Sequence, residues 1–148
     1  MKPAREQGST MAWTVIFLAV VVVPLMSLVI DGARLFYVRG RLQTAAEAAC
    51  EDAAWSAADR IRFRETGTTT FQDAWYHVGL AQNTFNQTLG EQNQRQYAAN
   101  VVVQMNPANA RAQCAAQASV PLMTTFGLAF SPVVIHAQAV ALIRFARP

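Results

Sequence analysis

Two cysteines are the residues of this 148-residue chain whose type most directly suggests covalent chemistry. Cys50 and Cys114 form the one pair that the sequence allows, far apart along the chain. A disulfide between them would suit a cross-linked domain in an oxidising compartment. The alternative is two unrelated thiols that pack as small hydrophobic side chains. From the residues alone both interpretations stay open.

The other reactive side chains do not form a catalytic or metal-binding motif. Glu47 and Glu51 are one helical turn apart without a third polar partner, which favours a solvated helix face over an acid/base pair. His77 is more typical of a surface or capping residue than of a ligand. The sequence has no glycine-rich phosphate loop, paired CxxC or nucleophile elbow. We therefore predict a non-enzymatic protein with no catalytic residues, cofactor, metal site or small-molecule substrate.

The charge distribution does not indicate a nucleic-acid partner. The net charge is +3, and the excess of basic residues is spread along the chain. The densest basic stretch, residues 60–64, interleaves a phenylalanine with arginines, but Asp59 and Glu65 flank it. A solvated segment with alternating charges is the prediction there, and no nucleic acid is expected to bind.

An uncharged apolar run over residues 11–30 predicts a membrane-spanning helix. As a helix, 20 residues span about 30 Å, the thickness of a bilayer core. A cleaved signal peptide has a shorter apolar region, about 7 to 15 residues, and a small-residue exit site, whereas Asp31 follows this run directly. We therefore predict a permanent anchor at 11–30 after a short segment at 1–10, with a kink at Pro24.

The orientation of the anchor is not decided by its flanking charges. Lys2 and Arg5 precede the run, whereas Arg34, Arg39 and Arg41 follow it, a slight bias toward a cytoplasmic C-terminus. The two cysteines favour the opposite orientation, because a disulfide persists outside the cytosol.

The helix is expected to continue beyond the membrane to about Ala58. Apolar residues recur there at steps of three or four, at Leu35, Val38, Leu42, Ala45, Ala49 and Ala53. Alanine propagates a helix well and leaves a thin surface that a neighbouring helix or sheet can approach closely. The positions predicted to serve this packing are Gly32, Ala33, Leu42, Ala45, Ala49 and Ala53.

A second amphipathic helix is predicted over residues 70–89. Thr70 and Asp73 resemble a capping box, and Gly90 supplies a stop signal. The side chains near one face, interpreted as core anchors, are Phe71, Trp75, Val78, Phe85 and Leu89.

From residue 97 the pattern changes to the two-residue alternation of strands. Strand signals lie within 97–144, with a turn at 106–109. On this account Cys114 faces the core, where a helix bearing Cys50 could lie across the sheet. The prediction is an α+β fold, with a domain over 31–148 that combines a helix extension (31–58), a second helix (70–89) and about three antiparallel strands.

A competing interpretation makes residues 112–143 a second membrane span, because they carry no charge. Prolines, glutamines and hydroxyl side chains in this stretch would be costly in lipid, so a sheet fits better. The link at 121–130 predicts either a loop packed on the core or an exposed apolar patch for a partner or the membrane surface.

The N-terminal sequence resembles a known family. Gly8-Ser-Thr-Met, the apolar run that ends in Asp31-Gly-Ala-Arg34, and the stretch from Arg41 to Ala49 are similar to the N-terminal module of TadE/TadG-like proteins of tight-adherence (Flp) pilus assembly. The likeness covers roughly residues 7 to 58, and the strand around 135–141 resembles the last strand of many members. It implies a single-pass, pilin-like protein with a cytoplasmic N-terminus, a helix through the inner membrane and a domain in the periplasm or outside the cell.

Two departures from the pilin pattern bear on processing. Peptidase-cleaved pilins usually carry Glu five residues after the cleavage glycine, and Trp13 stands there if Gly8 is that glycine. The chain therefore resembles uncleaved TadG-type members more closely. Ala33 replaces the usual glycine before Arg34, which still preserves a small residue for close helix packing.

The resemblance implies a minor pilin or assembly factor whose partners are the lipid bilayer and other pilin-like subunits, reached through the N-terminal helix. On this view, replacing Ala45 or Ala49 by Leu should disturb assembly more than domain stability. Asp31 and Arg34 are predicted to form a pair at the membrane border or to act as headgroup-level anchors. The alternative function is an accessory single-span subunit that stabilises another membrane complex.

Overall fold

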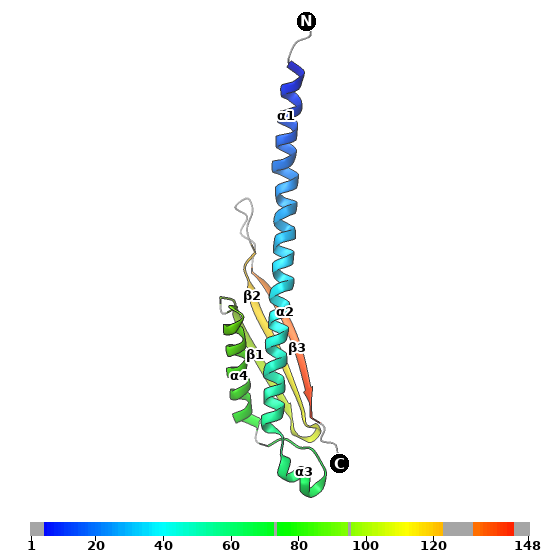
Figure 1. Cartoon of the computed structure of the whole chain (residues 1–148), viewed down its shortest axis with the longest axis vertical. Coiled ribbons are helices and arrows are strands. Elements are labelled where there is room, and N and C mark those ends of the chain that lie inside the picture. Colours follow the sequence, from blue (N-terminus) through cyan, green and yellow to red (C-terminus); the bar gives the residue numbers. More distant parts are fainter. Residues whose placement is uncertain (1–4, 73, 95, 123–131, 144–148) are drawn as a thin grey trace.

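The computed structural model describes residues 5–72, 74–94, 96–122 and 132–143. One long helical rod carries a three-stranded sheet and a second long helix along its C-terminal half (Figure 1). The rod comprises α1 (Arg5–Phe17), a π-helical turn η1 (Leu18–Val22) and α2 (Val23–Ala57). The predicted α+β class, with a long N-terminal helix and an antiparallel sheet, is confirmed.

The N-terminal half of the rod is apolar and uncovered. The helix from Thr10 to Ala57 contains a stretch long and apolar enough to cross a membrane, and none of that stretch is buried in the protein. Large side chains on it, such as Trp13, Phe17 and Leu28, are exposed. Because so much apolar surface is unfavourable in water, these residues favour membrane anchoring.

Pro24 changes the local geometry of the rod without ending it. Proline has no backbone N–H and clashes with the preceding turn, so the carbonyl one turn earlier loses its partner. The π-helical turn Leu18–Val22 lies immediately before α2, which has Pro24 in its first turn. The helix continues through this region (Figure 1), so the backbone accommodates Pro24 by widening one turn.

The basic stretch after the rod forms a short helix that the sequence did not predict. Helix α3 (Arg60–Thr66) begins where the Asp59 carboxylate accepts a hydrogen bond from the backbone N–H of Arg62 at 2.9 Å. It ends at Gly67, whose φ of 72° favours glycine. Its arginines are exposed, as expected for a solvated segment.

Helix α4 (Ala74–Glu91) lies beside α2 and buries part of the predicted apolar face (Figure 1). Phe71, Phe85 and Leu89 are buried, but the prediction that Trp75 is a core anchor is wrong, since 80% of its surface is exposed. Phe71 takes the core position at this end of the helix, because its bridge with Ala58 holds it there. The proposed capping box cannot be followed, since Asp73 is outside the described residues.

The sheet is antiparallel and has the order β1-β2-β3. Its strands are β1 (Ala98–Asn106), β2 (Arg111–Val120) and β3 (Val133–Leu142), and a short 3-10 turn, η2 (Pro107–Asn109), joins the first two. Along β2 the side chains alternate between core and solvent, as the sequence predicted. The described parts of 112–143 therefore include two strands, whereas most of the link at 121–130 is outside the described residues.

Candidate assembly surface

The alanines of α2 pack inside the domain, where this helix contacts both α4 and the strands β2 and β3. Those with no exposed surface are Ala45, Ala46, Ala49, Ala53, Ala54 and Ala57. The facing side chains of the sheet are also mostly small, including Ala112, Ala116, Ala118, Ala137 and Ala139. Small residues on both surfaces let the helix backbone approach the strands closely, so α2 is built into the core of the domain.

These contacts change the partner assigned to the predicted packing residues. Leu42, Ala45, Ala49 and Ala53 pack inside their own chain and present no surface to another subunit. The expectation that Ala45→Leu or Ala49→Leu mainly disturbs assembly stays a prediction, but the burial of both residues favours a loss of domain stability instead. Periodicity identified the face that packs, but it could not say whether the packing partner was internal or external.

We expect Ala49→Leu to destabilise the domain by about 1–3 kcal/mol, because extra methylene groups must enter a filled helix–sheet contact. Chemical denaturation of the full chain in detergent measures this change. Ala33→Leu is the matched control on the same helix, since Ala33 is exposed and a larger side chain there meets solvent or lipid. Equal unfolding midpoints for Ala49→Leu and the unaltered chain would contradict the packing account.

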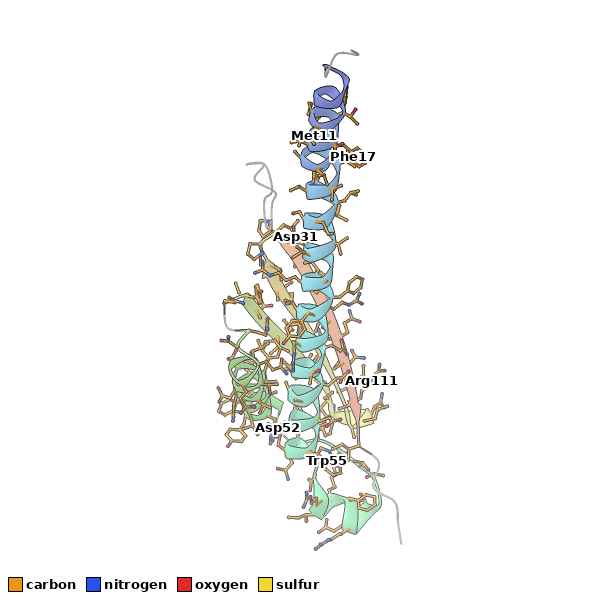
Figure 2. The ribbon with its side chains drawn as sticks, turned by 45° about the horizontal axis from the view of Figure 1, so that its top comes forward. Met11, Phe17, Asp31, Asp52, Trp55 and Arg111 are labelled. Carbon is orange, nitrogen blue, oxygen red and sulfur yellow. A yellow bond between two sulfur atoms is a disulfide. The ribbon has the colours of Figure 1, made fainter. Side chains whose placement is uncertain are left out.

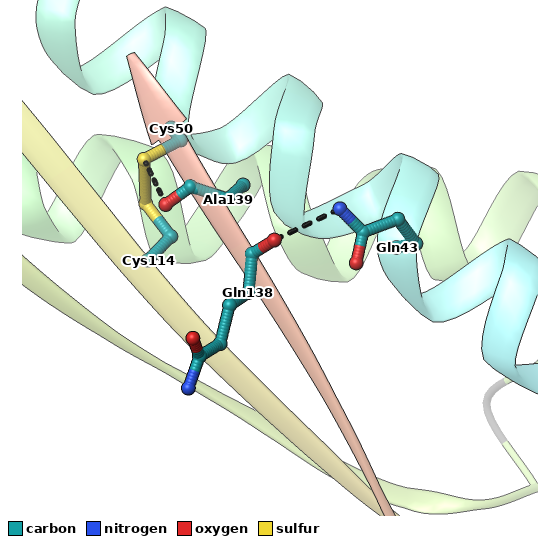
Figure 3. Close-up of a disulfide and its surroundings, with 5 residues drawn as sticks. All are labelled: Gln43, Cys50, Cys114, Gln138 and Ala139. Carbon is teal, nitrogen blue, oxygen red and sulfur yellow. Dashed lines mark hydrogen bonds between the residues drawn. A yellow bond between two sulfur atoms is a disulfide. The ribbon is translucent and has the colours of Figure 1, made fainter.

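A disulfide joins α2 to the central strand. Cys50 and Cys114 are bonded, with their Cα atoms 5.7 Å apart (Figure 3). Cys50 Sγ also lies 3.6 Å from the carbonyl oxygen of Ala139. We interpret this as a packing contact, because a disulfide sulfur carries no hydrogen to donate.

A second link fastens the same helix to the edge strand. Gln43 Nε2 donates to the carbonyl oxygen of Gln138 on β3 at 2.9 Å (Figure 3). The same nitrogen also donates to Glu47 Oε1 at 2.8 Å. Together with the disulfide, this contact ties α2 to both β2 and β3.

Arg34 fastens the membrane-proximal end of the domain. Its Nε and one terminal nitrogen donate to the Tyr97 hydroxyl at 3.1 and 3.0 Å, and its other terminal nitrogen donates to the Pro121 carbonyl at 3.4 Å. The guanidinium carbon also lies 5.5 Å from the centre of the Tyr97 ring. One arginine thus links α2 to the residues just before β1 and just after β2.

The sequence did not single out Tyr97 as a partner of Arg34. The general signal was that a tyrosine hydroxyl needs a hydrogen-bonding partner when it is buried. The structure shows that Tyr97 is buried. Asp31 and Arg34 are both half-buried. Their mutual pairing at the membrane border stays a prediction.

The remaining reactive side chains lie on the surface. Glu47 and Glu51 are exposed, and His77 Nδ1 lies 3.0 Å from the Ser56 hydroxyl. Among the described residues, no group of three or more histidine, cysteine or acidic side chains is arranged to hold a metal ion.

The exposed side of α2 near the membrane combines small and aromatic residues. Ala33, Phe36, Tyr37 and Gly40 are all exposed and recur at steps of three or four, so they share one face. The Arg41 guanidinium carbon lies 5.2 Å from the centre of the Tyr37 ring. A Cβ atom added to Gly40 would meet nothing within 4 Å. This membrane-proximal face is the candidate surface for a partner helix.

Comparison with known proteins finds a family match over the N-terminal part of the chain. Residues 8–60 match the sequence model of a family described as putative Flp pilus-assembly TadE/G-like, which confirms the resemblance drawn from the sequence. The matched region extends from within α1 through α2 to the first residue of α3. No curated protein and no solved structure matches the chain.

Proposed function

We propose that this chain is a non-enzymatic, membrane-anchored, pilin-like protein of a tight-adherence pilus or secretion system, acting as a minor pilin or assembly factor. The family match over residues 8–60 associates the chain with Flp pilus assembly. The observation that carries the finer proposal is the single helix that runs from the apolar stretch into the core of the α+β domain. Such a rod couples the position of the domain to that of its anchor, as a filament joint requires.

The proposed location is the inner membrane, with a cytoplasmic N-terminus and the α+β domain in the periplasm or outside the cell. The disulfide between Cys50 and Cys114 supports this orientation, because disulfides persist in oxidising compartments and are rare in the cytosol. The domain then begins close to residue 31, where the apolar run ends.

The proposed partners are the bilayer and other pilin-like subunits. Because the alanines of α2 are used internally, we assign subunit contact to the membrane-proximal face of Ala33, Phe36, Tyr37 and Gly40. Gly40 lets another helix approach closely, and Phe36 and Tyr37 offer apolar surface for it to cover. This assignment separates a variant that harms assembly from one that harms folding.

Gly40→Leu is expected to lower recovery of pilus components in a pull-down by about tenfold, equivalent to ~1.4 kcal/mol of binding free energy. The reason is that a leucine blocks close approach of a partner helix, whereas its Cβ atom meets nothing within 4 Å in its own chain. The unfolding midpoint should not fall, since leucine is also a better helix former than glycine.

The matched control is Gly79→Leu on α4, where an added Cβ atom also meets nothing within 4 Å. It makes the same chemical change on a different exposed helix face, and pull-down should equal that of the unaltered chain. Undiminished recovery with Gly40→Leu would refute the assigned surface. Recovery of an unrelated membrane complex without any pilus component would refute the pilus role and favour an accessory subunit.

A further inference from the structure

A groove lies between α2 and the edge strand β3, beside the end of the apolar run. Its volume is about 420 Å³. The lining residues are Gly32, Leu35, Phe36, Arg39, Val133, Val134, Ile135 and His136. Its walls are therefore mostly apolar, and Arg39 is the residue among them with a permanent charge.

The position of this groove relative to the bilayer follows from the continuous helix. Gly32 comes two residues after the uncharged run, which ends at Ile30. The first residues of β3 lie toward the apolar half of the rod (Figure 1). Figure 2 shows Asp31 at about the height at which β3 begins. Residues lining the groove thus start at the boundary between the hydrocarbon core and the headgroup layer.

The Arg39 side chain can reach the headgroup layer from the side on which the α+β domain lies. Nine residues separate it from Ile30, a rise of about 14 Å at 1.5 Å per residue. The interfacial layer on one side of a bilayer is about 5–7 Å thick, which leaves about 7 Å between it and the Arg39 backbone. Helical side chains point back toward the N-terminus, here toward the membrane, and a long arginine side chain covers that distance.

The chemistry of the groove matches an amphipathic anion. Phe36 and Val134 are exposed apolar side chains, 76% and 52% accessible, whereas Arg39 presents a guanidinium group. A guanidinium binds phosphate oxygens in a forked geometry, and apolar walls suit glycerol and the first methylene groups of acyl chains. Of the nearby charged groups, Arg34 is engaged by Tyr97, Arg41 stacks on Tyr37, and Asp31 already has a partner.

We propose that this groove seats the headgroup and glycerol region of one anionic phospholipid from the adjoining leaflet, with Arg39 holding its phosphate. Bound lipid then fills the space between α2 and β3 and fixes the rotation of the domain against the membrane. An anionic headgroup is preferred over a choline headgroup, because the quaternary ammonium would lie close to Arg39. The inference depends on membrane anchoring and does not require a pilus role. Phe36 lies where the groove meets the face assigned to a partner helix, so the two proposals share this side chain.

The test is native mass spectrometry of the full chain in neutral detergent with equimolar phosphatidylglycerol and phosphatidylcholine of identical acyl chains. The unaltered protein should retain about one phosphatidylglycerol and favour it at least about fivefold, equivalent to ~1 kcal/mol. Arg39→Gln should abolish this preference. Arg64→Gln, which removes the same charge from an exposed position on α3, should keep it.

A second pair of variants tests the groove itself and does not rely on Arg39. Val134→Asp puts a carboxylate into the groove and should lower phosphatidylglycerol retention at least about fivefold. Val102→Asp makes the same change at a comparably exposed position on β1 and should leave retention unchanged.

Four outcomes overturn the proposal. These are equal retention of the two lipids, full retention by Arg39→Gln, displacement by soluble glycerol phosphate as efficiently as by lipid, and a dimer that excludes lipid. The third would identify a site for a free phosphate, and the fourth would identify a second copy of the chain as the occupant.

Discussion

The paired substitution Cys50→Ala and Cys114→Ala is expected to lower the free energy of unfolding by about 4 kcal/mol. The disulfide closes a loop with a sequence separation of 64 residues, so its loss gives the unfolded chain much more freedom. Chain-entropy estimates for a loop of this length are about 4 kcal/mol. Chemical denaturation of the full chain in detergent, followed by circular dichroism, measures the change.

Reductant provides the internal control for this prediction. The unaltered chain in excess dithiothreitol should unfold close to the midpoint of the double variant, whereas the double variant should not respond to reductant. An unaltered chain whose midpoint is the same with and without reductant, despite complete reduction, would contradict the stabilising role of the disulfide.

The same pair of cysteines also reports the side of the membrane on which the domain lies. In intact cells, a membrane-impermeant maleimide should label Cys50 and Cys114 only after an external reductant and mild denaturation, because both side chains are buried. Labelling that requires the membrane to be breached would place the domain in the cytoplasm. That result would contradict the proposed orientation without altering the fold.

Phe85→Ala is expected to lower the free energy of unfolding by about 3–5 kcal/mol, the usual range for removing a buried aromatic side chain. Phe85 is 1% exposed and is the largest of the fully buried side chains. It lies on α4, which packs against α2 and contacts β1, so its loss leaves a cavity in the core. Thermal and chemical denaturation of the full chain should both register the change.

Trp75→Ala is the matched control for Phe85→Ala. Both changes remove an aromatic side chain from the same helix, but Trp75 is 80% exposed. Its substitution should change the free energy of unfolding by no more than about 0.5 kcal/mol. A large loss of stability with Trp75→Ala and a small one with Phe85→Ala would mean that α4 packs with a different face against the domain.

The contrast between Phe85 and Trp75 shows that a helical pattern predicts the helix but not which residues of its apolar face are buried. Both residues fit an apolar stripe, and the stripe predicted the existence of α4. Burial also depends on what covers each turn of the helix. Just before α4, Phe71 is held by its bridge with Ala58 and is buried, whereas Trp75 in the first turn of the helix is exposed.

The alanine-rich half of α2 illustrates the same limit at the level of function. Spacing and residue size predicted a close contact at Ala45 and Ala49, and a close contact is present. The identity of the packing partner depends on which later segment of the chain folds against this face of α2. Strands β2 and β3 come from residues more than 60 positions later, and no local pattern specifies which surface they cover.

The sequence by itself determined the features that depend on local composition and period: the apolar anchor, the long helix beyond it, the second helix and three strands in an α+β fold. Its N-terminal residues were also sufficient to indicate the TadE/G-like family. Only the tertiary structure decided that the alanines pack internally, that Arg34 bonds to Tyr97, and that a groove lies between α2 and β3 near the end of the apolar run. These features arise from contacts between distant segments, whose free energies depend on three-dimensional packing and are not encoded in any single stretch of the chain.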